Sequence, residues 1–222
     1  MARANLKQTA YERIKAGILS CEYAPGSLLN EDRLCQDLGM SRTPIRDALG
    51  RLEQERLITI RPKVGYLVSN VTADVIRMTY ESRILVEPYI ILNYCTDLSA
   101  QQLSELAAIQ QKVEKSVRSK GPDIYQYDHE FHSYLVSFCP NSYLREFYTS
   151  LSDQNNRLRI LVNRSSEKRI RETVSEHEYV LKALKKGDSR AAAEAMKEHL
   201  STALQATLLA FSQSQFDTSL TV

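Results

Sequence analysis

The hydrophobic pattern is helical over most of the chain and is interrupted by one short stretch of β-prone residues. Apolar positions three and four residues apart predict a first helix over 8–20. From Thr72 onward the same spacing predicts six longer helices, over 73–95, 99–118, 121–138, 141–162, 166–186 and 189–213. Pro88 falls inside the first of the six and is expected to kink it. Long helices joined by short loops are typical of an antiparallel bundle.

Two shorter helices with a tight turn between them are predicted ahead of this bundle. The first begins after Asn30, a favourable N-cap, and stops at Gly39. The second extends to Leu52 and begins at Ser41, which we expect to cap it. Pro44 lies in its first turn, where a missing N–H costs nothing. Two helices joined in this way form a helix-turn-helix.

The second of these helices has one apolar face and a basic start. Its apolar stripe consists of Ile45, Ala48, Leu49 and Leu52. Arg42 and Arg46 project from the other faces near the start, with Arg51 more peripheral. Arginine donates two hydrogen bonds to a guanine edge, and a helix N-terminus favours phosphate. The pattern indicates a helix that reads the major groove, although the helix alone is equally compatible with an ordinary solvated face.

A β-hairpin is predicted after the helix-turn-helix. Two β-prone runs, 57–61 and 66–69, flank the turn Pro62-Lys63-Val64-Gly65, with Lys63 at its tip. The helix over 8–20 would pack beneath through its apolar positions, which are Tyr11, Ile14 and Ile18. Residues 1–70 are therefore predicted to form a winged helix.

Charge is distributed unevenly between the two parts of the chain. Residues 1–70 hold 11 Lys/Arg against 8 Asp/Glu, whereas the remainder holds 18 against 19. The basic excess lies where contact with phosphate requires it, and it is small enough that tight binding calls for two copies. The length of 222 residues and the hydrophobic fraction of 43% allow two small domains, each with a core.

The cysteines and the longest apolar runs indicate the cellular compartment of the protein. Four cysteines are scattered without a Cys-x-x-Cys pair, at positions 21, 35, 95 and 139. This is typical of reduced thiols in a cytoplasmic protein, and a disulfide or a thiol switch is the alternative. No apolar run is long enough to span a bilayer, and the start lacks the apolar stretch of a secretory signal. We expect a cytoplasmic protein without a membrane partner.

Three histidines and one carboxylate of the predicted bundle are placed to meet at one point. Asp128 and His132 are four residues apart and share a helix face. His177 and His199 lie on the apolar faces of the last two helices. Imidazole and carboxylate suit zinc, nickel, iron or manganese; zinc is the first candidate and nickel the second. The alternative is three core histidines, each satisfied locally. His129 lies off the shared face and is left out.

A metal at this point would have two possible roles. Zinc-bound water hydrolyses substrates when a general base lies beside it. Glu130, the nearest base in sequence, is offset by two positions from the ligands of its own helix and points away, and no nucleophile or phosphate-loop motif is present. We expect instead an ion with open positions that anchors a small organic acid.

Other polar residues on inward faces are candidates to contact that effector. Asn155 interrupts an apolar stripe and would enter the core wall. Arg83 could pair with an effector carboxylate, or equally with Glu87 at i+4. Weaker candidates are Tyr134, Tyr148 and Arg159.

The string Ser41-Arg42-Thr43-Pro44-Ile45-Arg46-Asp47-Ala48-Leu49, with Arg33 before it and the Gly65 wing after it, carries a specific resemblance. The run from Leu28 to Val68 resembles the DNA-binding domain of GntR-family bacterial transcription regulators. The resemblance implies that operator DNA is contacted by Arg33, Ser41, Arg42, Thr43, Pro44, Arg46, Lys63 and Gly65.

A second resemblance covers the helical part. Asp128-His129-Glu130-Phe131-His132, followed by Asn141, His177 and His199-Leu200, is similar to the FCD effector domain of the FadR subfamily, in its six-helix, VanR-like variant. Many members bind a metal through the positions that are here Asp128, His132, His177 and His199. Arg83 resembles an arginine that FCD domains often keep on their first helix.

Together the two resemblances imply a mainly α protein: a winged helix-turn-helix over 1–70, an all-helical effector and dimerisation domain over 71–215, and a flexible tail over 216–222. The expected function is that of a transcriptional repressor. It would bind a palindromic operator as a homodimer and respond to a small carboxylate at the metal. A metal-dependent hydrolase, and a DNA-binding regulator with a metal-free structural bundle, are the alternatives.

Overall fold

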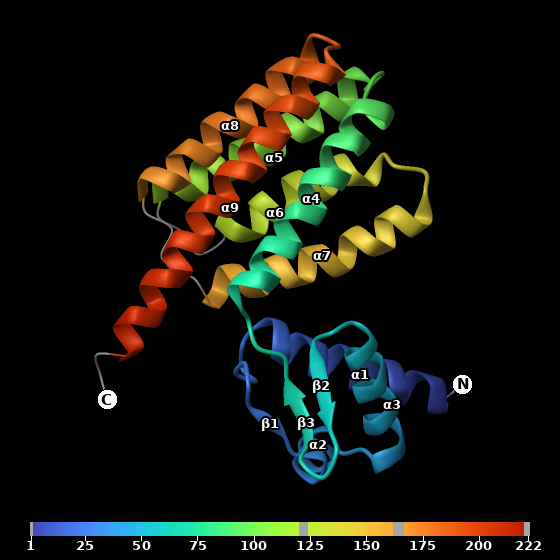
Figure 1. Ribbon diagram of the computed structural model, residues 1–222. Helices are drawn as coiled ribbons and strands as arrows, with labels where there is room; N and C mark the ends of the chain where they lie inside the picture. The colour runs from blue at the N-terminus through green and yellow to red at the C-terminus, as the bar shows by residue number, and fades with distance from the viewer. Residues whose placement is uncertain (1, 120–123, 162–166, 220–222) are drawn as a thin grey trace. The chain divides into compact units, whose positions relative to one another are not determined.

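The chain is mainly helical and divides into two compact units, Met1–Thr72 and Ala73–Val222 (Figure 1). The computed structural model describes residues 2–119, 124–161 and 167–219. The fold class is the predicted one, a winged helix-turn-helix followed by an all-helical bundle.

Three helices and a small sheet make up the first unit. Helix α1 (Ala2–Leu19) begins six residues earlier than predicted, and α2 (Glu31–Leu38) and α3 (Arg42–Gln54) form the helix-turn-helix. Oδ1 of Asn30 accepts a hydrogen bond from the Arg33 N–H at 3.0 Å, as expected for an N-cap. Gly39 ends α2 in the left-handed conformation, with φ of 63°.

The start of α3 differs from the prediction in one respect. Ser41 occupies the N-cap position with extended backbone, but its side chain makes no capping hydrogen bond. Pro44 lies in the first turn, as predicted, and is buried. Because the first four N–H groups of a helix have no intrahelical acceptor, the proline ring is tolerated there.

The sheet has three strands, one more than the predicted hairpin. Strand β2 (Ile58–Arg61) and β3 (Gly65–Val68) form the wing, with Ile58 opposite Val68 and Arg61 opposite Gly65. The additional strand, β1 (Leu28–Leu29), pairs antiparallel with β3 on its other side. Lys63 occupies the turn with φ of 64°.

The core of this unit joins all three helices to the sheet. Its buried residues include the predicted apolar stripes of α1 and α3, which are Tyr11, Ile14, Ile18, Ile45, Ala48, Leu49 and Leu52. Burial of the stripe fixes which face of α3 points outward. The arginines at the start of α3 therefore face solvent.

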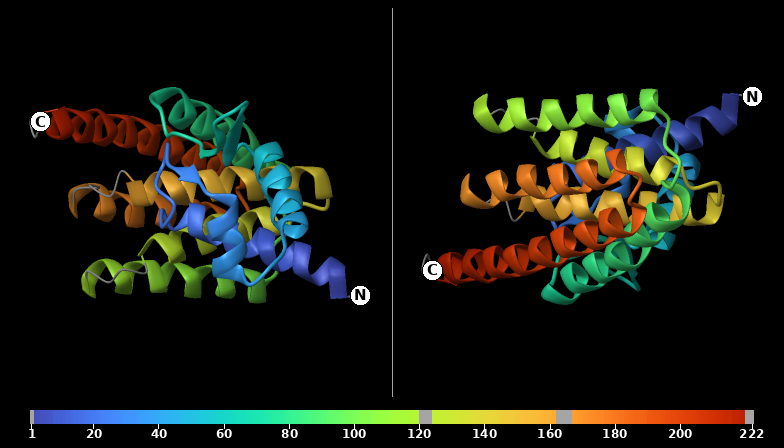
Figure 2. Two further views of the ribbon diagram at one scale, coloured as in Figure 1. Left: turned by 90° about the horizontal axis from the view of Figure 1, so that it is seen from below. Right: turned by 90° about the horizontal axis from the view of Figure 1, so that it is seen from above.

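The second unit is a bundle of six described helices (Figure 2). They are α4 (Ala73–Tyr94), α5 (Ala100–Ser119), α6 (Ile124–Ser137), α7 (Ser142–Leu161), α8 (Glu167–Lys185) and α9 (Ser189–Ser219). Helix α9 lies along α4 and beside α8, whereas α6 packs between α5 and α7. Helix α4 continues through Pro88.

Most helix boundaries agree with the prediction to within a few residues, but α9 is longer. It runs to Ser219, six residues past the predicted end at 213, and includes part of the segment 216–222 that was predicted as a tail. The predicted boundaries at 121, 162 and 166 lie outside the described residues.

Two further features bear on the sequence expectations. All four cysteines are free, and Cys95 and Cys139 are buried. Among the described helices, none combines the length and apolar character that a membrane crossing requires.

Candidate functional site

Two arginines at the start of α3 face solvent but are paired with acidic residues of α2. Arg42 Nη2 lies 2.7 Å from Asp32 Oδ1, and Arg46 Nε lies 3.0 Å from Glu31 Oε2. Hydrogen bonding to these carboxylates raises the pKa of both arginines. The two guanidinium groups are thus held as an ordered pair of cations at the outer end of the helix.

The remaining predicted DNA contacts lie on the same unit. Arg33, Ser41, Thr43 and Lys63 are exposed, and Gly65 is partly exposed in the wing. The side chain of Arg33 is 81% exposed, and its guanidinium lies 3.6 Å from Asp37. Pro44 differs from the others because it is buried, so it shapes the helix start and presents no surface.

In the second unit, three helices bring Asp128, His132, His177 and His199 together, as predicted. One potential ligand atom from each lies within 4.8 Å of all the others. The four residues are 5%, 1%, 0% and 3% exposed, respectively. Four buried polar groups converging on one point make up a candidate site and not a series of separate core residues.

The nitrogens that face this point are unusual for a protein interior. Within the described part of the chain, Nε2 of His132 and both ring nitrogens of His177 are buried without a hydrogen-bond partner. An unpartnered buried polar group costs about 1–3 kcal/mol. Nε2 of His177 lies 3.6 Å from Asp128 Oδ1, and its ring stacks on Phe131 with centroids 4.1 Å apart. The donor set and the unpartnered nitrogens fit a divalent metal ion.

A buried glutamate orients the first of the histidines. Glu87 Oε2 lies 2.6 Å from Nδ1 of His132, and Glu87 Oε1 accepts a hydrogen bond from Arg83 Nε at 2.7 Å. Burial would raise the pKa of Glu87, but Arg83 and then His132 outweigh it and hold the pKa at about 2. An ionised Glu87 makes Nδ1 the protonated nitrogen, which leaves the Nε2 lone pair facing the cluster.

A second glutamate does the same for His199. Glu176 Oε2 lies 2.6 Å from Nδ1 of His199, and Arg169 holds both oxygens of Glu176 at 2.8 Å. Burial lowers the pKa of His199 and of His177, which keeps both rings neutral near pH 7. Neutral imidazole is the form that binds metals.

Arg159, a weak candidate from the sequence, contacts the cluster directly. Its guanidinium is ion-paired with Oδ2 of Asp128 and donates to the backbone carbonyl of Tyr125 at 3.3 Å. Burial would raise the pKa of Asp128, but Arg159 and the three histidines hold that pKa well below its usual value. The carboxylate is therefore ionised.

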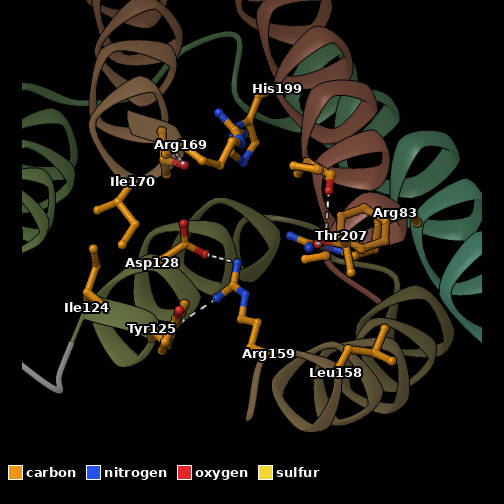
Figure 3. Close-up of a pocket in the computed structure, with 15 residues that line it drawn as sticks. Arg83, Ile124, Tyr125, Asp128, Leu158, Arg159, Arg169, Ile170, His199 and Thr207 are labelled. Carbon is orange, nitrogen blue, oxygen red and sulfur yellow. Dashed lines mark hydrogen bonds and ion pairs between the residues drawn. The ribbon is translucent and has the colours of Figure 1, made fainter. Parts of the chain in front are cut away.

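A cavity of about 70 Å³ adjoins the cluster (Figure 3). Its polar lining includes Tyr80, Arg83, Asp128, Arg159, Arg169 and His199. Of the two predicted effector residues, Arg83 lines this cavity while paired with Glu87. Asn155 is buried in α7 but is not among the described residues around the cavity.

The two residues set aside in the sequence analysis lie apart from the ligand set. His129 is hydrogen-bonded at Nδ1 to the Ser152 hydroxyl at 2.8 Å. Glu130 forms an ion pair with Lys112 at 2.9 Å, on the side facing α5. Neither takes part in the converging cluster.

Both units match known families. Residues 6–68 match the family described as bacterial regulatory proteins, gntR family, and residues 78–202 match the FCD domain. An HTH-type transcriptional regulator of Bacillus subtilis, YdhC, is 27% identical over 191 residues, which are 85% of each chain. The gluconate operon transcriptional repressor of Bacillus licheniformis is 24% identical over 85% of this chain and 79% of its own.

The fold is also found among solved structures. A transcriptional regulator GntR from Rhodococcus sp. RHA1 superimposes with a TM-score of 0.76 at 20% identity, over 94% of this chain and 98% of its own. The relatives are transcriptional regulators and not enzymes. The chain belongs to the gntR family of bacterial regulatory proteins and is a transcriptional regulator in which an FCD domain follows the winged helix.

Proposed function

We propose that this regulator is a homodimeric, cytoplasmic repressor of a palindromic operator, controlled by a small carboxylate that binds at a metal in the FCD domain. The observation that carries the proposal is the buried Asp128, His132, His177 and His199 cluster beside a cavity lined by arginines. Repression is proposed because similar regulators, such as the gluconate operon protein, are named repressors.

The proposed DNA contacts are made by the exposed cations of the winged helix. Arg42 and Arg46 lie at the start of α3 and Arg33 lies on α2, and all three would reach base edges in the major groove. Ser41 and Thr43 would contact phosphates, and Lys63 and Gly65 would place the wing against the sugar-phosphate backbone of the DNA. Pro44 would act by setting the helix start.

Asp128, His132, His177 and His199 would hold the metal, with zinc as first candidate and nickel as second. Support comes from the unpartnered nitrogens of His132 and His177, and from the two glutamates that fix the opposite ring nitrogens. When bound, such an ion supplies an electrophilic centre with positions open to a carboxylate. Arg83 belongs to the proposed effector pocket because it lines the cavity, whereas Asn155 would support it from within α7.

Exposed apolar side chains support the proposed homodimer. On α4, Met78, Leu85, Tyr89 and Leu92 share one helix face, and each is more than 40% exposed. On the neighbouring α7, Tyr143 and Phe147 are 81% and 47% exposed. Several large apolar side chains exposed on one helix face are typical of a protein interface. Two copies related by a two-fold axis would present two reading helices to two half-sites.

Helix α4 both follows the wing in the chain and carries Glu87, a residue that contacts the proposed metal site. Strand β3 ends at Val68 and α4 begins at Ala73, so residues 69–72 alone join them. Glu87, on α4, contacts the proposed ligand His132. An effector that changes the cluster would therefore act on α4, and a coupling of about 1–3 kcal/mol changes operator affinity roughly 5–150-fold.

The metal is tested by elemental analysis of the purified full chain after loading with zinc and dialysis. We expect one ion per chain in the wild type and in His129→Ala, and much less in His177→Ala. A full complement of metal in His177→Ala would exclude that ligand. No bound metal in the wild type, together with no change in melting temperature on adding a chelator, would favour a metal-free structural bundle.

DNA binding is tested on duplexes selected from a random pool by the full chain. Arg46→Ala should lower the affinity for the selected duplex about tenfold or more, because a bidentate contact to a base is lost. Arg13→Ala removes the same charge from an exposed position on α1 and should have a much smaller effect. Equal effects of the two substitutions would contradict the assignment of α3 as the reading helix.

A further inference from the structure

Three arginines line the cavity beside the cluster, and two of them are already neutralised. Arg83 is paired with Glu87, and Arg169 is paired with Glu176 through both oxygens. Each of these glutamates also holds a histidine ring, so it is fixed on two sides. Glu172 also lies 3.8 Å from Arg169, but it is 43% exposed and is not among the described residues that line the cavity. The positive charge of each arginine is therefore already neutralised by a glutamate.

Arg159 differs from the other two arginines. Within the described part of the chain, the one carboxylate that pairs with it is Asp128, which also belongs to the proposed ligand set. Its side chain is 15% exposed, and Figure 3 shows the guanidinium directed toward Asp128 and Tyr125 among the residues that line the cavity. Arg159 therefore shares its counter-ion with whatever the cluster binds.

The charges around the cavity can be counted for the metal-loaded state. The Arg83–Glu87 and Arg169–Glu176 pairs cancel, and histidines that bind a metal are neutral. Asp128 contributes one negative charge, Arg159 one positive charge and a divalent ion two. The sum is two positive charges in a buried space, where uncompensated charge is costly.

We propose that the effector is a small dicarboxylate whose two negative charges match this excess, and that Arg159 recognises its second carboxylate. This inference rests on the proposed function, because the first carboxylate would occupy the open positions of the metal. The second would form a bidentate, charge-assisted pair with the guanidinium. Apolar side chains along the cavity, Ile124, Leu158 and Ile170 among them, suit the carbon chain between the two groups.

The volume of the cavity limits the length of the carbon chain between the two carboxylates of the ligand. A volume of about 70 Å³ accommodates roughly five water molecules, which corresponds to an acid of about three to five carbon atoms. Malonate and succinate lie in this range, and butyrate has the carbon number of succinate with one charge fewer.

The test compares succinate with butyrate on the zinc-loaded full chain by isothermal titration calorimetry. Succinate should bind about tenfold or more tightly, as expected for one added charge-assisted pair. Arg159→Gln should lower the succinate affinity to the level of the butyrate affinity measured on the same variant, so that the preference for succinate disappears. Arg190→Gln, which removes an exposed arginine of α9, should leave both affinities unchanged.

The outcomes separate this inference from the proposed function. If the wild type binds zinc and butyrate but shows no preference for succinate, the dicarboxylate inference is overturned and the proposed function stands. If the preference persists in Arg159→Gln, the role of Arg159 is overturned. If the protein binds no zinc, both fail. The wild-type comparison decides the ligand class even if Arg159→Gln does not fold, and Arg159→Lys, which keeps the charge, should retain part of the preference.

Discussion

Oε2 of Glu87 lies 2.6 Å from Nδ1 of His132, with both side chains almost completely buried. This contact fixes the tautomer of a proposed metal ligand from a different helix, α4. Outer contacts of this kind orient ligands and raise their basicity. Glu87 is therefore as much a part of the candidate site as the histidine that it holds.

Replacing Glu87 with glutamine should weaken zinc binding about 10–100-fold, the usual effect of losing such an orienting carboxylate. The isosteric amide keeps the volume but removes the charge that fixes His132 and neutralises Arg83. Competition with a chromogenic zinc chelator measures the change. Glu81→Gln, at an exposed position on the same helix, serves as control. An unchanged zinc affinity in Glu87→Gln would show that His132 does not depend on Glu87.

Glu31 should restrain the DNA-reading arginines. It contacts both Arg42 and Arg46, at 3.5 and 3.0 Å. Glu31→Gln should raise the affinity for a random duplex roughly two- to fivefold, the range expected for freeing exposed ion pairs. Fluorescence anisotropy measures it. Glu22→Gln changes the net charge equally from an exposed position. An identical gain in duplex affinity in that variant would show that the gain comes from net charge and not from release of Arg42 and Arg46.

The metal-free protein should lose stability below about pH 6.5. Burial holds the pKa of His177 well below 6.5, so the folded chain resists a proton that the unfolded chain accepts. The stability that this group contributes is therefore fully present above the unfolded pKa and declines as the pH falls toward the folded one. Urea titrations of chelated protein from pH 8 to pH 5 measure the slope. His177→Asn should make it shallower; an identical slope would assign the dependence to other groups.

The exposed face of α4 should hold two copies together. Leu85, 74% exposed, lies at the centre of its apolar stripe. Leu85→Glu would place a charge in that contact, and we expect light scattering to give half the wild-type mass. Tyr179→Glu introduces the same charge at an exposed aromatic residue of α8 and should leave the mass unchanged. A wild type that is already monomeric at micromolar concentration would contradict the proposed homodimer.

The helices and the histidine cluster were predictable because each follows from periodicity within one element. Asp128 and His132 share a face by their spacing, and the burial of His177 and His199 follows from the apolar residues around them. The caps at Asn30 and Gly39 are likewise local. Strand β1 was missed because two residues show no alternation and gain their partner only from β3.

The residues that orient the cluster could not be inferred in the same way. An arginine and a glutamate four apart, such as Arg83 and Glu87, indicate an ion pair on a helix but not that the pair is buried against a histidine 45 positions away. Arg169 and Glu176 are seven apart, and nothing in that spacing points to His199. Contacts between helices depend on packing, which a one-dimensional pattern does not record.

Each of the two glutamates contacts both an arginine and a histidine, and this sharing has an evolutionary consequence. Loss of Arg83 alone strands the buried anion of Glu87, and loss of Glu87 alone strands the buried cation of Arg83 together with an unoriented ring. In the second trio Arg169 keeps Glu172 at 3.8 Å, but loss of Glu176 leaves the ring of His199 unoriented. Divergence at 83, 87 and 132, or at 169, 176 and 199, is therefore expected to proceed in compensated steps. Related regulators should keep each trio whole or replace it as a unit.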